Sequence, residues 1–119
     1  MLEVVLPTYR EDYLPQRKLL LDPNNYRFQD DPDYVHADEK RFHELGVQER
    51  AFRRLKAEES LVQLKNSFRT NGFIPLERLV VRPYSHAEDC YLVLEGNRRV
   101  AALRWIADDY QAGVEVPES

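Results

Sequence analysis

The segment Tyr91–Leu103, YLVLEGNRRVAAL, contains the feature that most restricts the fold. The apolar run Tyr91–Leu94 predicts a short buried strand, and the alanine-rich stretch from about Arg98 to Gln111 predicts a helix. Gly96 lies between the two, and glycine permits a sharp reversal and a close approach of the backbone. We therefore expect a sheet with a helix packed directly behind one of its strands.

The remaining pattern predicts a hairpin, further helices and several turns. Polar and proline-containing stretches mark the connections between the periodic segments. Together they predict an α+β fold, with helices packed on a small mixed sheet. In the first half we expect a short strand at Leu2–Leu6, an irregular segment at Tyr9–Gln16, a strand at Lys18–Leu21, a turn at Asp22–Asn25 and a loop at Phe28–Ala37. Helical structure is expected from about Asp38, and Gly46 divides it. A further helix ends at Asn71 and Gly72, and a strand at Leu79–Arg82 then pairs with Tyr91–Leu94.

Composition excludes several classes of protein. A chain of 119 residues, 43% of them hydrophobic, can close a single core. Its 17 basic and 21 acidic residues give a net charge of −4, so the segment lacks the excess of cations that would hold it on duplex DNA unaided. The single cysteine cannot form an internal disulfide, no signal peptide is recognisable, and no apolar run approaches the roughly 20 residues that cross a bilayer. We expect a cytoplasmic protein without a membrane partner.

The turn at Gly96 carries the strongest indication of a binding site. Asn97 is a favoured helix N-cap, and the amides of the first helical turn would point outward at the positive end of the helix dipole. Arg98 and Arg99 stand where that dipole disfavours positive charge, which favours a negative partner such as phosphate. One arginine could instead pair with Glu95. The alternative is a simple helix cap with both arginines in water.

The order of motifs resembles the N-terminal domain of ParB-like partition proteins, in the ParB/sulfiredoxin superfamily. The motifs are the turn DPNNYR at Asp22–Arg27, the helix Ser60–Gly72 that ends in glycine, the strand Leu79–Pro83, and the GNRRVAAL turn. They are similar to the family's N-x-Q-P-R-like, S-I-x-x-x-G-like and G-E-R-R-x-x-A motifs. The resemblance covers about Lys18–Ile106.

The resemblance implies a nucleotide site. In ParB-like proteins the G-x-R-R turn grips the phosphates of a nucleotide, which here assigns Gly96, Asn97, Arg98 and Arg99 to binding. Arg27 matches the arginine of the first motif, near the same pocket. CTP or ATP with Mg²⁺ is the implied cofactor, and no residue is assigned to a metal. Asn97 stands where the family usually has glutamate, and the first motif lacks its proline.

The resemblance also divides the chain and suggests its context. Residues 1–17 would form an N-terminal arm and residues 18–119 the ParB/sulfiredoxin-like domain, with a helical insertion at about 28–59 that serves as a lid or an interface. Val114–Val116 alternates like the start of another strand that this segment does not complete. We therefore expect the segment to be the N-terminal part of a longer protein. DNA would be bound only through regions beyond this segment, in a partition, regulatory or defence protein of a prokaryote or phage. Nucleotide-loaded partition domains close as dimers, which implies a homodimer.

Other activities of the superfamily remain alternatives. Sulfiredoxin-like reductases place a catalytic cysteine directly after the glycine, where this chain has Asn97, and Cys90 precedes the strand, so a reductase is not expected. Some relatives are kinases, and Glu95 or Asp22 could act as base in a phosphotransferase or nucleoside triphosphatase. A third hypothesis is a degenerate domain that serves as a protein-interaction module through its insertion.

The other polar and aromatic groups favour ordinary structural roles. His36, His43 and His86 lack the spacing of metal ligands and are expected on the surface. The cluster Arg50, Arg53, Arg54 and Lys56 is flanked by Glu44, Glu49, Glu58 and Glu59, which predicts a salt-bridged helix face. Trp105 and Tyr110 are expected in the core, and Cys90 is expected to be a small, half-buried apolar group.

Overall fold

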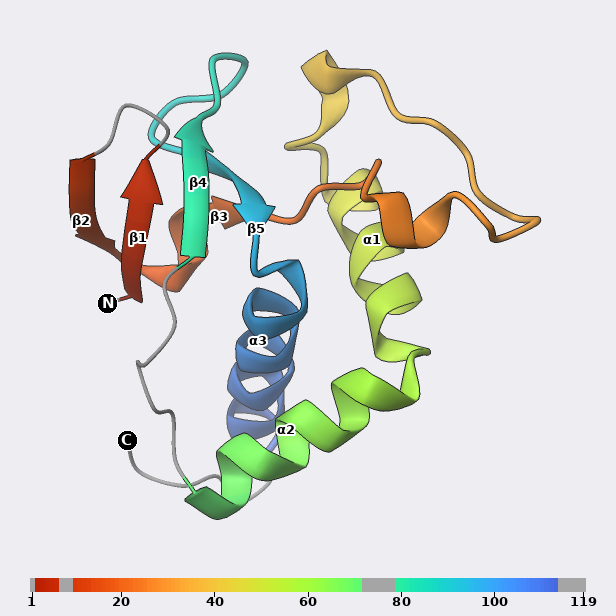
Figure 1. The fold of residues 1–119 in the computed structure, drawn as a ribbon, viewed down its shortest axis with the longest axis vertical. Coiled ribbons are helices and arrows are strands. Elements are labelled where there is room, and N and C mark those ends of the chain that lie inside the picture. The colour runs from red at the N-terminus through yellow and green to blue at the C-terminus, as the bar shows by residue number, and fades with distance from the viewer. Residues whose placement is uncertain (1, 7–9, 72–78, 114–119) are drawn as a thin grey trace.

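The computed structural model describes residues 2–6, 10–71 and 79–113 of the chain. Within these residues a mixed sheet of five strands lies beside three α-helices (Figure 1). The strands are β1 (Leu2–Leu6), β2 (Arg10–Leu14), β3 (Leu19–Leu20), β4 (Leu79–Pro83) and β5 (Tyr91–Glu95), and the helices are α1 (Leu45–Lys56), α2 (Glu59–Asn71) and α3 (Asn97–Gln111). Single turns of 3₁₀ helix lie at Gln16–Lys18, Tyr26–Phe28 and Glu39–Arg41. The predicted α+β class is confirmed.

The sheet has the order β2-β1-β4-β5-β3. β4 and β5 pair as the predicted antiparallel hairpin, and β1 pairs antiparallel with β2 and parallel with β4. The short strand β3 runs parallel to β5, with Leu19 opposite Tyr91 and Leu20 opposite Leu92. Because β3 and β5 leave the sheet at the same edge, the turn after β3 lies next to the start of α3.

The main core lies between the sheet and the helices. α3 follows β5 directly, and α2 packs across it (Figure 1). Val100, Ala101 and Ala102 of α3 are almost completely buried, and Leu55 and Leu61 bring α1 and α2 into the same cluster. The two alanines let α3 pack closely against its neighbours, since their side chains occupy little space between backbones.

Two parts of the expected organisation need correction at the N-terminal end. The polar segment Tyr9–Gln16 was expected to be irregular, yet Arg10–Leu14 forms edge strand β2. Backbone pairing with β1 along the whole of the strand outweighs the polar composition there. Residues 1–17 were expected to form an arm, but β1 and β2 belong to the sheet and β1 is bonded to β4.

The expected insertion, at about residues 28–59, also differs from its prediction. Gly46 does not divide a helix; it lies in the first turn of α1, which begins at Leu45. The apolar face of α1 enters the main core through Ala51, Phe52 and Leu55. The segment therefore helps to build the domain, whatever further role it has. The strand expected from Val114 lies outside the described residues.

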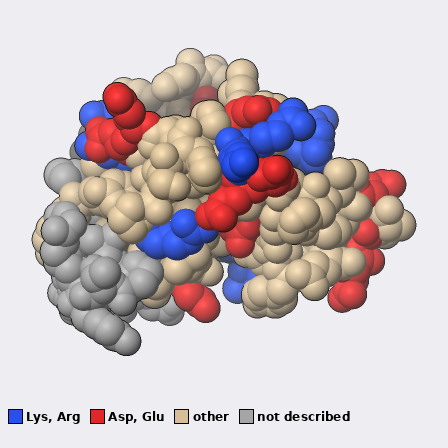
Figure 2. Space-filling model, turned by 90° about the horizontal axis from the view of Figure 1, so that it is seen from above, with Lys and Arg blue, Asp and Glu red and all other residues tan. Residues whose placement is uncertain are grey.

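The surface carries no single sign of charge on the face that Figure 2 shows. Acidic and basic side chains lie next to one another there, as the mixed composition implies. Among the described residues, no helix is long and apolar enough to cross a membrane.

Candidate functional site

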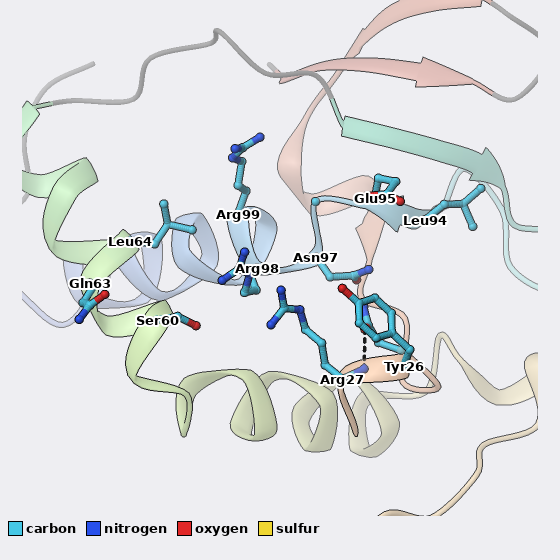
Figure 3. Close-up of a pocket in the computed structure, with 12 residues that line it drawn as sticks. Tyr26, Arg27, Ser60, Gln63, Leu64, Leu94, Glu95, Asn97, Arg98 and Arg99 are labelled. Carbon is cyan, nitrogen blue, oxygen red and sulfur yellow. Dashed lines mark hydrogen bonds between the residues drawn. The ribbon is translucent and has the colours of Figure 1, made fainter. Parts of the chain in front are cut away.

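A pocket of about 550 Å³ opens at the N-terminus of α3 (Figure 3). Three segments that are distant in sequence form its walls: the turn after β3, the first turns of α2, and the junction of β5 with α3. All six residues that the sequence assigned to the site lie in its lining. The pocket is lined by Asn25, Tyr26, Arg27, Ser60, Gln63, Leu64, Leu94, Glu95, Gly96, Asn97, Arg98 and Arg99.

The N-terminus of α3 has no side-chain cap. The first bond of the helix runs from the Val100 N–H to the Gly96 carbonyl, at 3.1 Å. The amides of Asn97 and Arg98 precede it, and neither donates to an acceptor within the described part of the chain. The amides of the first helical turn were expected to point outward, but the Val100 N–H is used in this bond. Two unused donors therefore lie at the positive end of a 15-residue helix.

Asn97 has a different role from the predicted one. It is the first residue of the helix, and its side chain is buried rather than folded over the amides of the first turn. Its Oδ1 accepts from the Asp22 N–H at 2.9 Å, and its Nδ2 donates to the Val93 carbonyl at 3.1 Å. The side chain therefore joins the turn after β3 to the end of β5. This tertiary role explains why the helix is left without a side-chain cap.

Gly96 is required at the junction for two reasons. Its φ of 100° is left-handed, a conformation that side chains with a β-carbon rarely adopt. A β-carbon there would also lie 2.3 Å from Cδ2 of the buried Leu79 on β4. The residue therefore sets both the direction of α3 and its distance from the sheet.

Local hydrogen bonds hold Arg27 at the opposite wall of the pocket. The backbone N–H of Arg27 donates to Oδ1 of Asn25 at 3.0 Å, which caps the N-terminus of the 3₁₀ turn Tyr26–Phe28. Phe28, the next residue, is buried in the main core and fixes the turn against the domain. The predicted turn at Asp22 is also present, since Asp22 Oδ1 accepts from the Asn24 N–H at 2.9 Å.

The pocket gathers more positive than negative charge. Figure 3 shows the side chains of Arg27 and Arg98 pointing toward the same space, with Arg99 directed away from them. Arg27 lies 3.7 Å from a carboxylate oxygen of Glu58, whereas Arg98 forms no ion pair with another described residue. The alternative that Glu95 neutralises Arg98 is not observed. Two guanidinium groups that converge without full neutralisation form a site suited to an anion.

Asp22, next to the pocket, has an altered proton affinity. Burial raises the pKa of its carboxyl above the ordinary value, because ionisation requires loss of hydration. The Asn24 N–H and the charge of Arg82 oppose this shift, and the charge of Glu39 adds to it. Asp22 does not line the pocket, so the geometry does not support it as a base acting there.

Several lining residues were missed from sequence. Tyr26 is 73% exposed although aromatic, and the guanidinium carbon of Arg27 lies 5.7 Å from its ring centroid. Ser60 and Gln63 reach the pocket from α2, and Leu64 lines the pocket while also packing against the core. Only the packing of α2 across α3 brings Ser60, Gln63 and Leu64 to the site, and no local sequence pattern predicts that packing.

The other candidates occupy mostly structural positions. The three histidines are exposed as expected, and Cys90 is half-buried beside the small cluster of Leu20, Phe42, Tyr84 and Leu92. Trp105 packs at the edge of the core, but Tyr110 is 70% exposed, so its predicted burial was wrong. No group of three or more potential metal ligands occurs in the described ranges.

The basic residues on the predicted salt-bridged face of α1 contact other groups than the flanking glutamates. Arg54 pairs with Asp31 of the preceding loop, and Lys56 lies over the ring of Trp105. The flanking glutamates bind arginines elsewhere: Glu49 bonds to Arg104 at 2.6 Å, and Glu44 pairs with Arg41. The expected pairs are wrong because tertiary packing brings Arg104 to Glu49, and Arg41 lies three residues before Glu44.

Comparison with known proteins adds no family assignment. No protein-family model matches the chain, and no curated protein or solved structure is significantly similar to it. The likeness to ParB-like domains therefore depends on the order of the sequence motifs.

Proposed function

We propose that this domain binds a nucleoside triphosphate, or a related phosphate-bearing anion, with a phosphate group at the N-terminus of α3. The observation that carries the proposal is the meeting of two unused helix amides, at Asn97 and Arg98, with the side chains of Arg98 and Arg27 in one pocket. In this role the amides donate to the phosphate and the guanidinium groups bind its outer oxygens.

Physical chemistry favours phosphate over other partners. The unused N–H groups and the dipole of a helix together favour an anion at the N-terminus, by about 0.3–1 kcal/mol for an exposed charge and up to about 2 when partly buried. An arginine can add two parallel charge-assisted hydrogen bonds to phosphate oxygens. The like charges of Arg27 and Arg98 repel each other until an anion lies between them, so binding also relieves that repulsion.

The rest of the pocket suits the organic part of a nucleotide. A volume of about 550 Å³ exceeds what a phosphate group needs and lies within the usual range for organic ligands, about 300–1,000 Å³. The exposed ring of Tyr26 offers a stacking surface for a base, and Leu64 and Leu94 supply apolar contact. The ligands proposed are CTP or ATP with Mg²⁺.

The direct test is calorimetry with CTP, ATP, GTP and UTP in the presence of Mg²⁺. At least one nucleotide is expected to bind, and Arg98→Ala should weaken it by about tenfold or more, as expected for loss of a charge-assisted contact. Arg17→Ala is the matched control, because Arg17 is exposed outside the pocket and its loss changes net charge equally. Equal losses in both variants, or no binding of any nucleotide, would contradict the proposal.

A second candidate function is phosphoryl transfer with Glu95 as the base. Glu95 lines the same pocket and forms no ion pair with another described residue, so its carboxylate is available to accept a proton from a hydroxyl. This role requires transfer of the γ-phosphate to an acceptor and loss of that transfer in Glu95→Gln. Transfer that persists in Glu95→Gln would exclude Glu95 as the base.

The wider setting follows from the motif resemblance. We propose a ParB-like, cytoplasmic, DNA-associated domain in a partition, regulatory or defence protein, with DNA bound through other regions and a homodimer formed around nucleotide. Sedimentation with and without the bound nucleotide tests the dimer. If no nucleotide binds, the remaining hypothesis is a protein-interaction module formed by residues 28–59.

A further inference from the structure

A second pocket, of about 380 Å³, lies between α1 and the loop at residues 29–38. This loop runs alongside α1 on the side away from the sheet (Figure 1). Apolar groups line the pocket from both sides: Phe28, Val47 and Ala51 on the domain side, and Tyr34 and Val35 on the loop. None of its lining residues belongs to the pocket at α3, so it is a separate cavity.

Three arginines of α1 line the same cavity. Asp31 neutralises Arg54, but Arg50 and Arg53 are exposed and form no ion pair with any described residue. Asp33 also lines the cavity and opposes one of these charges. The charged residues at the cavity therefore leave one positive charge without a compensating carboxylate, next to the apolar interior.

We propose that this cavity binds a small amphipathic monoanion, namely an organic carboxylate with an aromatic or branched apolar body. The body occupies the space between Phe28, Val47 and Tyr34, and the carboxylate binds Arg50 and Arg53 at the rim. The volume lies at the lower end of the range for organic ligands, about 300–1,000 Å³, which selects a compact molecule. Because only one positive charge at the cavity is uncompensated, a monoanion is favoured over a polyphosphate.

The cavity differs from the α3 site in the chemistry of its donors. Its rim lies along the side of α1 from Arg50 onward, where the backbone N–H groups are used within the helix, so the arginine side chains are the donors there. Arg50 and Arg53 are one helical turn apart on α1, so both can reach one carboxylate group. The hydroxyl of Tyr34 is already bonded to Oδ1 of Asn24, at 3.1 Å, so its ring remains the contacting surface.

The test uses 4-phenylbutyrate as the probe and its neutral analogue 4-phenylbutanamide as the matched control, each followed by ¹H–¹⁵N NMR of the whole chain. Phenylbutyrate is expected to shift the amides of Phe28, Val47 and Ala51, and the amide analogue should bind about tenfold more weakly, as expected for loss of the charged contact. The double variant Arg50→Met, Arg53→Met should lose the preference for the carboxylate, whereas Lys40→Met, which removes an exposed charge outside the cavity, should keep it.

The result also separates this site from the one at α3. Arg98→Met is expected to leave phenylbutyrate binding unchanged, because Arg98 does not line this cavity. The proposal is overturned if the two ligands bind equally, if the shifts cluster at Asn97 and Arg98, or if no shift occurs up to about 10 mM, the weak end of useful affinity.

Discussion

The side chain of Asn97 accepts a hydrogen bond from the backbone N–H of Asp22, 75 positions earlier in the chain, at 2.9 Å. A second side-chain amide supports the same segment, since Gln48 bonds both the N–H and the carbonyl of Leu21 at 2.9 Å. Strand β3 has only two residues, so these amides hold the chain where strand pairing ends. The turn that carries Arg27 is thereby fixed beside the N-terminus of α3.

Replacement of Asn97 by alanine should destabilise the domain. The variant removes the partner of the part-buried Asp22 N–H and a buried hydrogen bond to the Val93 carbonyl, at a cost of about 2 kcal/mol in the free energy of unfolding. Urea denaturation measures this cost, and Asn71→Ala, at the exposed end of α2, should stay within about 0.5 kcal/mol of the parent. Similar losses in both variants would show that the Asn97 side chain does not join the two segments.

The three described glycines provide a graded test of the β5–α3 junction. Gly96→Ala should cost about 2–4 kcal/mol, because it combines a positive φ with a clash against Leu79. Gly113→Ala has the positive φ of 86° but open space, so it should cost about 1 kcal/mol. Gly46→Ala, within α1, should be neutral or stabilising by about 0.5 kcal/mol. Thermal or urea unfolding gives the order, and a Gly96 variant no worse than the Gly113 variant would contradict the clash.

Local patterns predicted much of this fold. The strand-glycine-helix segment at Tyr91–Gln111, the hairpin and the helix ending at Asn71 all follow from periodicity and turn residues that act within a few positions. Strand β2 was missed because an edge strand needs no alternating apolar side, and its pairing with β1 is decided by backbone geometry. The start of α1 was misjudged because one glycine in a first turn costs a helix little.

The site was only partly predictable for a similar reason. Arg27, Glu95 and Gly96 to Arg99 all line one pocket, as motif order suggested. Gln63 could not be foreseen, because the α2 side chains that face the pocket depend on how α2 crosses α3. Tyr26 lies on the 3₁₀ turn beside Arg27, and its position in the sequence does not give the direction of its ring. The role of Asn97 was misjudged because the sequence does not tell a helix-capping asparagine from one that bonds distant segments. Only the tertiary structure shows its partners, Asp22 and Val93.

Asp22 should make stability depend on pH in the acid range. Its pKa is raised by burial, so the folded state holds the proton more tightly than the unfolded state does. Stability from this group is therefore greatest below the ordinary carboxyl pKa and falls as pH rises through the raised one. Asp22→Asn should remove this fall while keeping the acceptor for the Asn24 N–H.

The measurement is the unfolding free energy of Asp22→Asn minus that of the parent, from about pH 3 to pH 7, the range in which carboxyl groups usually titrate. The difference should increase in favour of the variant as pH rises. A difference that is constant, or that moves the other way, would show that burial of Asp22 does not dominate its titration.

A variant of Tyr26 should separate contacts to the nucleotide base from contacts to its phosphates. Its exposed ring can stack on a base, a contact worth about 1–3 kcal/mol, so Tyr26→Ala should weaken the binding of whichever nucleotide the calorimetric screen identifies by about tenfold. Binding of inorganic pyrophosphate should change little, since it has no base. Equal weakening of both ligands would mean that Tyr26 acts by positioning Arg27 rather than by stacking.

The most direct test of the central claim is a ¹H–¹⁵N NMR titration of the isotope-labelled chain with inorganic pyrophosphate. The amide resonances of Asn97 and Arg98 should move as these groups begin to donate to the anion, and Arg98→Ala should weaken the response by about tenfold while Arg17→Ala should not. If pyrophosphate leaves both amides unchanged, or moves them equally in the two variants, the N-terminus of α3 is not the phosphate site.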